Sequence, residues 1–324
     1  MTPVRILVTG ALGYMGQYLC WTLMEDQSVE LHGTYRTRGF HASDERCQLH
    51  KLDLNDAAAT AKLIGKLQPH QIYHLAGNIH AGRTTGSDAR TSWNDNLLAT
   101  LNLYDACIQA HVSPRIVLAS SGAIYGESTD GQPITEATEL RPLNAYAASK
   151  AAADLAGYQY WKTHQIPVIR ARLFNYLGPG QDESTALSRF AYQLARLERA
   201  KAQPAMLHVG NLDAERDFTD IADLVRALML LMERGEPGEA YNVASGISHP
   251  MKWYLNELIK QIPIPIEVNT DPTLLRSAEA QRLQVDISKL QAHTEWKPMI
   301  PLQQTLSSMM ITCRDVVAIK SQSG

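Results

Sequence analysis

The feature that most limits how this chain can fold is the alternation of strand-like and helix-like segments through its first half. Six runs rich in β-branched and apolar residues are strand candidates, at Val4–Val8, Val29–Tyr35, Cys47–Leu52, Gln71–Ala76, Arg115–Ser120 and Val168–Arg172. Helical stretches separate most of them, at Gln17–Met24, Ala57–Leu67, Asn94–Ala110 and Ala145–Lys162. Strands connected through helices pair in parallel by right-handed crossovers. The pattern therefore predicts an α/β fold with a doubly wound parallel sheet.

The alternation stops after Phe174, which indicates a second, smaller domain. Glycine and proline gather at Gly178–Gly180, and a helix is expected over Leu187–Ala200. We expect residues 1–173 to form the doubly wound domain, with about residues 211–245 returning to it. Residues 174–210 and 246–324 then form the second domain. Ligands of doubly wound sheets bind beyond the carboxyl ends of the strands, so the loops there carry the chemistry.

The composition places the chain among globular proteins and narrows its partners. Hydrophobic residues make up 45% and charged residues 19%, which argues against intrinsic disorder. The formal net charge of −3 supplies no positive field for nucleic acid or an anionic membrane. No apolar run approaches the ~18 residues of a membrane span, and no signal-peptide pattern opens the chain, so we expect a cytoplasmic protein. Scattered cysteines and histidines predict no metal site.

A glycine-rich turn follows the first predicted strand and leads into the first helix. Its sequence is Thr9-Gly10-Ala11-Leu12-Gly13-Tyr14-Met15-Gly16. Glycines allow a tight turn and let backbone N–H groups approach a pyrophosphate at a helix N-terminus. A tight turn without a ligand is the simpler alternative, but the position at the first strand-to-helix junction favours dinucleotide binding. The residues predicted to contact the cofactor are Gly10, Leu12, Gly13, Tyr14, Met15 and Gly16.

The end of the second strand discriminates between nicotinamide cofactors. An acidic residue there would bind the adenosine ribose hydroxyls and repel a 2′-phosphate. The sequence instead has Gly33-Thr34-Tyr35-Arg36-Thr37-Arg38, with two arginines and no carboxylate. Guanidinium groups form bidentate, charge-assisted bonds to phosphate. NADP(H) is therefore favoured, with Arg36 as a phosphate ligand. NAD(H) remains possible, and the alternative is that both arginines belong to a solvated loop.

Three residues form a candidate catalytic set. Tyr146 and Lys150 are one helical turn apart, which places them on the same face of the predicted helix. A lysine ammonium beside a phenol favours the phenolate, so it lowers a tyrosine pKa that starts near ~10. Tyr146 could then exchange a proton with a carbonyl or an alcohol while hydride moves. Ser121, at the end of the fifth strand, could hold the same substrate oxygen.

The glycine turn and this catalytic set together resemble the extended short-chain dehydrogenase/reductase family over nearly the whole chain. The resemblance implies a Rossmann domain with a smaller C-terminal substrate domain. It also implies that Asp53 and Leu54 lie beside the adenine, and that Leu75, Ala76 and Gly77 lie near the ribose and pyrophosphate. Asn96 matches the family in the helix after the fourth strand, and Arg172-Leu173-Phe174-Asn175 matches it further on, with Asn175 on the substrate side. Members of this family commonly pair their long helices as dimers, so we expect a homodimer.

Within that family, residues 209–220 resemble a stretch shared by GDP-mannose 4,6-dehydratases and GDP-4-keto-6-deoxy-mannose reductases. The resemblance implies that Asn211 and Arg216 lie near a nucleotide diphosphate. The alternative for Arg216 is an ion pair with Asp217 or Asp220. Residues 276–279 resemble a second stretch of the same enzymes, and imply that Arg276 and Glu279 engage the diphosphate and ribose. There Ser277 replaces the usual proline.

One departure from the dehydratases decides between the two activities. Dehydratases of this kind carry an acid and a base two residues and one residue before the hydrophobic-Tyr-Gly that follows the serine strand. Here those positions are Gly122 and Ala123. The resemblance therefore implies NADPH-dependent reduction of the C4 ketone of GDP-4-keto-6-deoxy-D-mannose, giving GDP-D-rhamnose or GDP-6-deoxy-D-talose. The alternatives are an NDP-sugar 4-epimerase that retains NAD, and a non-catalytic NADP-sensing protein.

Overall fold

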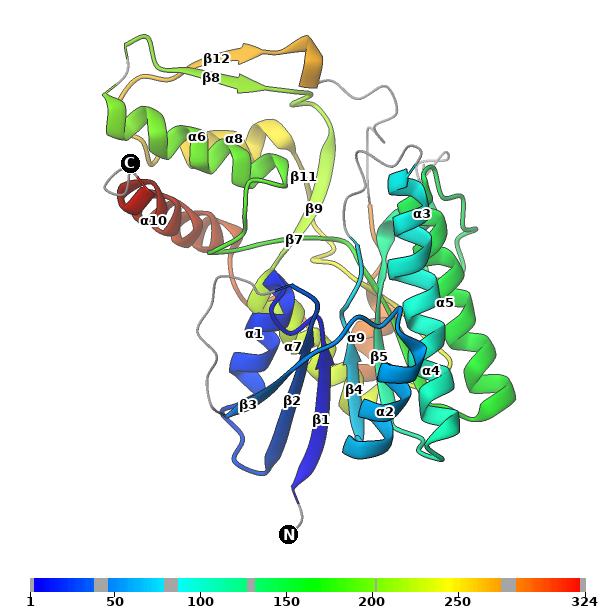
Figure 1. The fold of residues 1–324 in the computed structure, drawn as a ribbon. Coiled ribbons are helices and arrows are strands. Elements are labelled where there is room, and N and C mark those ends of the chain that lie inside the picture. Colours follow the sequence, from blue (N-terminus) through cyan, green and yellow to red (C-terminus); the bar gives the residue numbers. More distant parts are fainter. Residues whose placement is uncertain are drawn as a thin grey trace.

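The computed structural model describes residues 3–37, 46–78, 87–126, 132–201, 203–274 and 284–320. Its largest sheet has seven strands in the order β10-β6-β5-β4-β1-β2-β3, and every neighbouring pair is parallel (Figure 1). The bounds of these strands are β1 (Val4–Thr9), β2 (Val29–Tyr35), β3 (Cys47–Lys51), β4 (Gln71–His74), β5 (Arg115–Ser121), β6 (Val168–Leu173) and β10 (Ala240–Val243). The predicted doubly wound α/β fold is confirmed.

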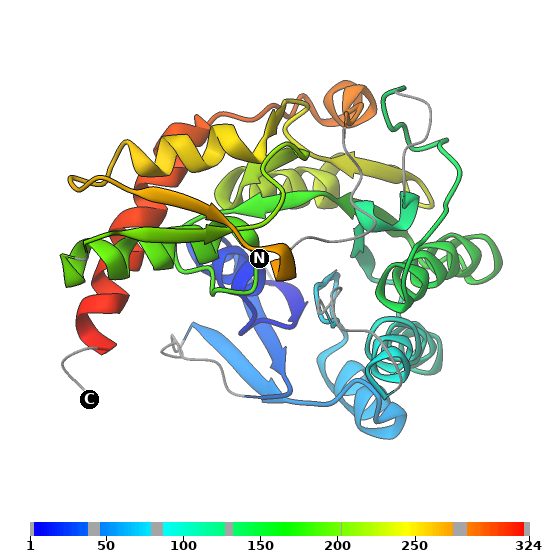
Figure 2. The same ribbon diagram turned by 90° about the horizontal axis from the view of Figure 1, so that it is seen from above.

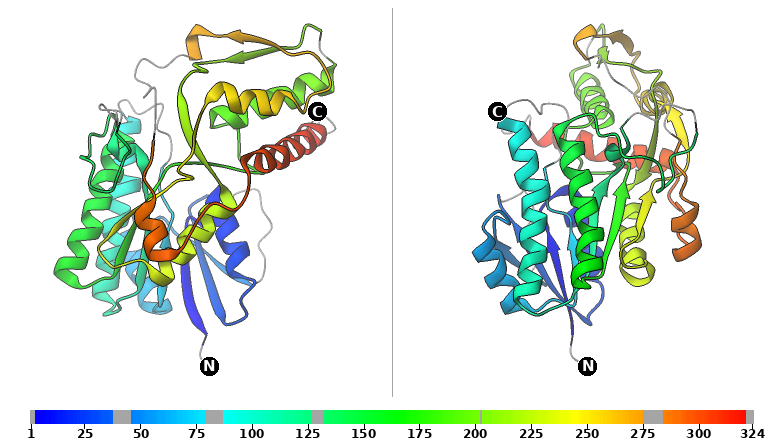
Figure 3. Two further views of the ribbon diagram at one scale, coloured as in Figure 1. Left: turned by 180° about the vertical axis from the view of Figure 1, so that it is seen from behind. Right: turned by 90° about the vertical axis from the view of Figure 1, so that its right-hand side faces the viewer.

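Helices cover both faces of this sheet, as the views from behind and from the side show (Figure 3). One layer contains α1 (Tyr14–Leu23), α7 (Ile221–Arg234) and α9 (Ser288–Thr294), and the other contains α2 (Ala57–Leu67), α4 (Ala99–Gln109) and α5 (Ala145–His164). Along β1, Ile6 and Val8 belong to the core under the first layer, and Leu7 to the core under the second. A strand buried on both faces needs such an unbroken apolar run.

The helix expected over Asn94–Ala110 begins earlier and is not uniform. Its first part is α3 (Ser87–Trp93), and a single π-helical turn, η1 (Asn94–Leu98), connects it to α4. Such turns are rare and frequently occur at functional sites. The turn buries two consecutive polar residues, Asp95 and Asn96.

A smaller lobe lies above the carboxyl ends of the large sheet (Figures 1 and 2). It contains a three-stranded sheet in the order β11-β9-β7 and a separate pair of strands, β8 and β12. Its elements are β7 (Asn175–Leu177), α6 (Ala186–Ala200), β8 (Met206–Val209), β9 (Glu215–Asp220), β11 (Ser248–Pro250), α8 (Met251–Ile259), β12 (Glu267–Thr270), η3 (Pro272–Leu274) and α10 (Leu302–Lys320). This lobe has a core of its own, between α6, α8 and α10. Between its segments, α7 and β10 return to the large sheet.

Two further properties apply to the part of the chain that the structure describes. No helix there is both long enough and apolar enough to cross a membrane. The four cysteines, Cys20, Cys47, Cys107 and Cys313, are free thiols, and all four are buried.

Candidate active site

The glycine turn connects β1 to α1 at the carboxyl end of the large sheet, and two of its positions leave no room for a side chain. Gly10 has a φ of +71°, and a Cβ there would lie 3.0 Å from the backbone of Ala76. A Cβ on Gly16 would lie 2.2 Å from the carbonyl oxygen of Gly10. The N-cap of α1 is Gly13, which has no side chain to bond the first N–H groups of the helix. The turn therefore offers backbone donors and a closely approachable surface, which suits a pyrophosphate.

Arg36 follows β2 directly and forms a two-pronged ion pair. Its Nη1 donates to Oδ1 of Asp95 at 2.8 Å, and its Nη2 donates to Oδ2 at 3.0 Å. Asp95 also accepts from Nδ2 of Asn55, whose backbone N–H donates to the carboxylate of Asp53. The hydrogen bond with Asp95 raises the pKa of Arg36. Its side chain remains 54% exposed, so a buried carboxylate orients a guanidinium that solvent can still reach.

The other residues predicted for the adenosine and ribose lie at the ends of β3 and β4. Leu54 is buried, whereas Asp53 is exposed. Leu75 packs against the core under α1, and the backbone N–H of Ala76 donates to Oγ1 of Thr9 at 3.1 Å. Of these segments, Leu75 and Ala76 border the glycine turn, because a Cβ on Gly10 would touch the backbone of both residues.

Gly77, Asn96 and Lys150 meet beside this surface. A Cβ on Gly77 would lie 2.7 Å from Oδ1 of Asn96 and 3.0 Å from Nζ of Lys150. Asn96 accepts from the backbone N–H of Asn78 and donates to Oγ of Ser149, so its amide is held from both ends. Nζ of Lys150 donates to the carbonyl of Ala119 at 2.9 Å, and burial lowers the pKa of Lys150 to about 8.

Ser121 and Tyr146 complete the predicted catalytic set. Ser121 is the last residue of β5, and its hydroxyl accepts from the backbone N–H of Ala123 at 3.2 Å. Tyr146 lies in the first turn of α5, which Asn144 caps by accepting from Ala147. Burial raises the pKa of Tyr146, and a hydrogen bond with Ser121 opposes this rise only in part. The direction is opposite to the expected lowering, because the loss of hydration outweighs the favourable contacts.

On the side of the smaller lobe, the predicted residues are more accessible. Asn175 is exposed on β7, and its Nδ2 donates to the carbonyl of Asp217 at 3.3 Å. Asn211 is partly exposed in the loop before β9. Arg216 is partly exposed on β9, where its Nη1 donates to the carbonyl of Glu215.

The two carboxylates proposed as ion-pair partners of Arg216 bond elsewhere. Asp217 accepts from the backbone N–H and the hydroxyl of Ser245, and Asp220 accepts from the hydroxyl of Thr305. Arg38, Arg276, Ser277 and Glu279 lie outside the described residues.

Sequence reasoning missed two sets of groups at this site. The first is Asp95, which binds Arg36. In the sequence, only the position of this acidic residue next to Asn96 indicates a role at the site. The second set surrounds His74, whose ring bonds Oγ1 of Thr9 at 2.7 Å and Oγ1 of Thr100 at 2.9 Å. Burial lowers the pKa of His74 to about 3, so its ring is neutral. Both ring nitrogens of His74 thus have hydrogen-bond partners inside the protein. No group of three His, Cys, Asp or Glu residues within the described ranges could hold a metal ion.

Comparison with known proteins identifies the family. A family model described as GDP-mannose 4,6 dehydratase matches residues 7–309. GDP-6-deoxy-D-mannose reductase from Pseudomonas aeruginosa is 34% identical over 94% of this chain and 96% of that enzyme. The chain belongs to the GDP-mannose 4,6-dehydratase family. This confirms the resemblance to extended short-chain dehydrogenases/reductases.

Solved structures of similar proteins have the same fold. RMD from Pseudomonas aeruginosa complexed with NADPH superposes with a TM-score of 0.84 at 30% identity, over 97% of this chain and 100% of that one. A putative epimerase from Burkholderia cenocepacia J2315 superposes with a TM-score of 0.85, also at 30% identity and the same coverage. The relatives and neighbours of this chain thus include a GDP-6-deoxy-D-mannose reductase and a protein described as a putative epimerase.

This chain has no room for a carboxylate at position 122. Gly122 opens the short 3₁₀ turn η2 (Gly122–Tyr125) that follows Ser121. A Cβ on Gly122 would lie 2.6 Å from a ring carbon of Phe174, well inside contact distance. The neighbouring Ala123 has no ionisable group. The aromatic ring therefore fills the space into which an acid at position 122 would project.

Proposed function

We propose that this protein uses NADPH to reduce the C4 ketone of GDP-4-keto-6-deoxy-D-mannose, giving GDP-D-rhamnose or GDP-6-deoxy-D-talose. The observation that carries the proposal is a complete Ser121, Tyr146 and Lys150 set at the end of β5, beside a Gly122-Ala123 pair that has no carboxylate. Removal of water from the sugar needs an acid and a base at that pair. Reduction needs only one proton donor, which Tyr146 supplies.

The residues at the cofactor surface fit a nicotinamide dinucleotide. Gly10 and Gly16 leave the close approach that a pyrophosphate requires, and the side chain of Asn96 holds the loop beside Gly77 and Lys150. The cofactor supplies the hydride when it is bound. Arg36 favours NADP(H), because its exposed guanidinium group can donate hydrogen bonds to a 2′-phosphate while Asp95 fixes its direction. NAD(H) is less favoured, because no carboxylate follows β2 directly to bind the adenosine ribose hydroxyls.

The catalytic set supplies the proton that the reduction needs. The raised pKa of Tyr146 keeps its phenol protonated near neutral pH, which is the form that can donate to the C4 oxygen of the sugar. The Ser121 hydroxyl orients the same oxygen. Lys150 is buried beside Gly77, where its ammonium binds the nicotinamide ribose and stabilises the phenolate that forms after proton transfer.

The smaller lobe would bind the nucleotide sugar. We place Asn175, Asn211 and Arg216 on the substrate, with Arg276 and Glu279 as further ligands of the diphosphate and ribose. A diphosphate needs local cations in a chain of net charge −3, and guanidinium groups match its oxygens with bidentate, charge-assisted bonds. In this proposal the substrate lobe contains residues 174–210 and most of 246–324, as the sequence predicts. It also includes β9, which the prediction assigned to the doubly wound domain, and it excludes α9, which packs against β10 and α7.

A homodimer through the long helices is part of the same proposal. Four apolar side chains are partly or largely exposed there, namely Trp93 on α3, Leu98 in η1, and Leu155 and Tyr158 on α5. These helices lie side by side on one flank of the molecule (Figure 3). Light scattering at micromolar concentration should give twice the 35.9 kDa of one chain. A single-chain mass would contradict the dimer.

A second candidate is an NDP-sugar 4-epimerase. It is supported by the similarity to the Burkholderia cenocepacia protein, which is described as a putative epimerase. An epimerase uses the same three residues but regenerates its cofactor in each turnover. Incubation of the purified protein with GDP-4-keto-6-deoxy-D-mannose and NADPH separates the two. Stoichiometric loss of NADPH absorbance with a GDP-6-deoxyhexose identified by NMR is the expected result. In a parallel incubation with an NDP-sugar, conversion to the C4 epimer without net loss of NADPH would instead identify the protein as an epimerase.

A further inference from the structure

Helix α5 carries two of the proposed catalytic residues, yet its buried face consists mostly of small side chains. The buried residues of α5 are small, apart from two charged ones: Ala147, Ser149, Lys150, Ala151, Ala153, Asp154 and Gly157. Packing of large side chains between others normally fixes how a helix lies on a sheet. Small residues alone give few such contacts. On the face toward the sheet, the directional contacts of α5 therefore come from Lys150 and Asp154, whereas Tyr160 packs against Tyr104 of α4. The proton transfer depends on how this face lies on the sheet.

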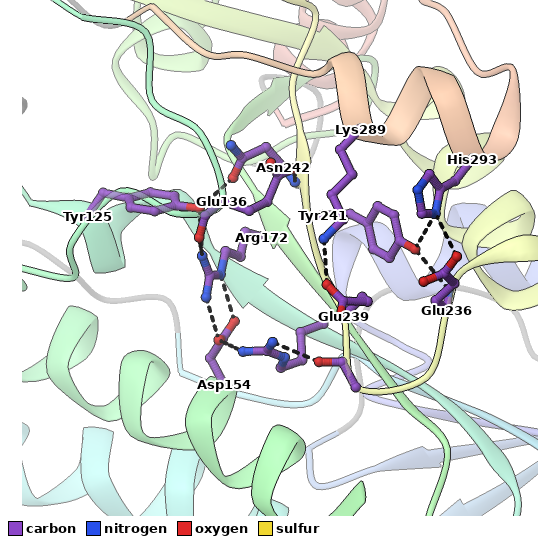
Figure 4. Close-up of polar contacts among 12 residues, drawn as sticks. Tyr125, Glu136, Asp154, Arg172, Glu236, Glu239, Tyr241, Asn242, Lys289 and His293 are labelled. Carbon is purple, nitrogen blue, oxygen red and sulfur yellow. Dashed lines mark hydrogen bonds and ion pairs between the residues drawn. The ribbon is translucent and has the colours of Figure 1, made fainter. Parts of the chain in front are cut away.

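Asp154 lies one turn beyond Lys150 and is fully buried, at 0% exposure. Its carboxylate accepts from Nη1 of Arg170 at 2.8 Å, and from Nε and Nη2 of Arg172 at 3.1 and 2.9 Å. Both arginines come from β6, the strand beneath α5 (Figure 4). A buried carboxylate held by two guanidinium groups fixes the helix in direction and in register.

Arg172 extends the contact to the segment that follows Ser121. Its Nη1 donates to the hydroxyl of Tyr125 at 2.8 Å and to the carbonyl of Glu136 at 2.9 Å. Burial raises the pKa of Tyr125 to about 12, so its phenol stays protonated and donates to Oδ1 of Asn242 at 2.7 Å. Figure 4 shows this continuous path from Asp154 through Arg172 to Tyr125 and Asn242.

Tyr125 closes the short turn η2 that begins one residue after Ser121. Its ring lies over Phe174, with ring centroids 6.1 Å apart, and Phe174 packs against Gly122. Movement of Tyr125 would therefore move the turn that orients the Ser121 hydroxyl. The Asp154–Arg172–Tyr125 contacts, here called the bridge, join that turn to the helix of Tyr146 and Lys150.

We propose that Asp154, Arg172 and Tyr125 are positioning residues for the reduction, because the bridge sets where the Ser121 hydroxyl lies relative to the Tyr146 phenol. The inference rests on the proposed function, since both hydroxyls must reach one substrate oxygen. Buried ion pairs often add little net stability, because desolvation offsets their attraction. Here the ion pairs of Asp154 instead fix one position of α5 on the sheet, because small side chains alone would permit several.

The test uses Tyr125→Phe, which keeps the ring and removes only the hydroxyl that Arg172 and Asn242 share. Misplacement of reacting groups by an ångström lowers rates by up to about a hundredfold, so we expect kcat to fall about ten- to a hundredfold. The KM of the ketone and the Kd of NADPH should change less than about twofold, because neither contacts the bridge. Arg172→Lys keeps a cation for Asp154 but lacks the fork, and should lower kcat similarly. If Tyr125→Phe does not fold, the kcat of Arg172→Lys alone tests the proposal.

The matched control is Tyr241→Phe. Tyr241 is also fully buried, and its hydroxyl bonds the backbone N–H of Glu236 and the ring of His293. It should lose thermal stability like Tyr125→Phe but keep its kcat. The double variant Tyr125→Phe with Arg172→Lys should be no slower than its slower parent, because one path is broken twice.

Three outcomes overturn the bridge: unchanged kcat in the folded bridge variants, an equal loss of kcat in Tyr241→Phe, or additive losses in the double variant. Tyr146→Phe, measured beside them, separates this from a failure of the proposed function. If the parent protein reduces the ketone and Tyr146→Phe does not, the function stands whatever the bridge variants do. If the parent protein leaves the ketone unreduced, it is the proposed function that fails.

Discussion

The two halves of the proposed site carry different kinds of groups. On the large sheet, Asn96, Ser121 and Lys150 are buried, and each hydrogen-bonds a backbone group or a buried side chain. On the smaller lobe, Asn175 is exposed and Arg216 is partly exposed. Buried groups that are already fixed spend no free energy on ordering as the reaction proceeds, whereas exposed side chains must be ordered by the ligand. The large sheet should therefore govern kcat, and the smaller lobe should govern KM.

The largest effect should come from Tyr146→Phe on the large sheet. This change removes only the proton donor, and loss of a positioned general acid typically lowers the rate on the order of 10²–10⁴-fold. NADPH binding, followed by fluorescence, should be nearly unchanged, because the ring remains. Turnover within about tenfold of the parent enzyme would remove Tyr146 from its proposed role.

Arg216→Ala should show the opposite pattern on the smaller lobe. Charge-assisted bonds from a guanidinium to phosphate contribute roughly 1.5–3 kcal/mol, so the substrate KM should rise about ten- to a hundredfold. The kcat should change less, if the diphosphate is held alike in the ground and transition states. Arg216→Lys should recover part of the loss, because it restores the charge without the fork. A lower Tm with an unchanged KM would instead make Arg216 a structural residue.

The sequence predicts the large sheet more fully than the smaller lobe, for physical reasons. Alternating strands and helices leave a strong period in the sequence, and all six predicted strands are present within a few residues. Glycines at forced close approaches, such as Gly10 and Gly16, are equally visible. Long-range side-chain contacts leave no such trace: Arg36 and Asp95 are 59 positions apart, and Phe174, between β6 and β7, fills the space beside Gly122. The pKa of Tyr146 was predicted in the wrong direction, because burial cannot be read from a four-residue spacing.

Arg36→Glu tests whether an accessible arginine on the large sheet behaves like the lobe residues. The change places a like charge beside a 2′-phosphate and beside Asp95, so the Kd of NADPH should rise roughly tenfold or more, and that of NADH much less. Titration of both cofactors into the same variant gives the ratio directly. Equal weakening of NADPH and NADH would contradict a phosphate contact. Arg36→Gln, which removes the charge without reversing it, should fall between the parent and Arg36→Glu.

The smallest and most diagnostic effect concerns the pH dependence that Lys150 should impose. Burial lowers the pKa of Lys150 to about 8, whereas an exposed lysine titrates near ~10.4. If the ammonium form binds the nicotinamide ribose, kcat/KM for NADPH should halve near pH 8 and keep falling above it. That parameter reports groups of the free enzyme, to which this pKa belongs. A plateau that extends to about pH 10 would contradict the role of Lys150.

Stability should change in the opposite direction over the same pH range, which separates titration from denaturation. Between about pH 8 and 10.4 the unfolded chain keeps the proton on residue 150, but the folded protein has lost it. Because the unfolded state then binds more protons, the contribution of Lys150 to the free energy of unfolding rises with pH. Lys150→Met lacks this contribution, so the stability of the parent enzyme relative to Lys150→Met should increase from pH 7 to pH 10, as measured by urea unfolding. A relative stability that stays constant over this range would mean that the Lys150 ammonium is not depressed by burial, and the fall in kcat/KM would then need another group.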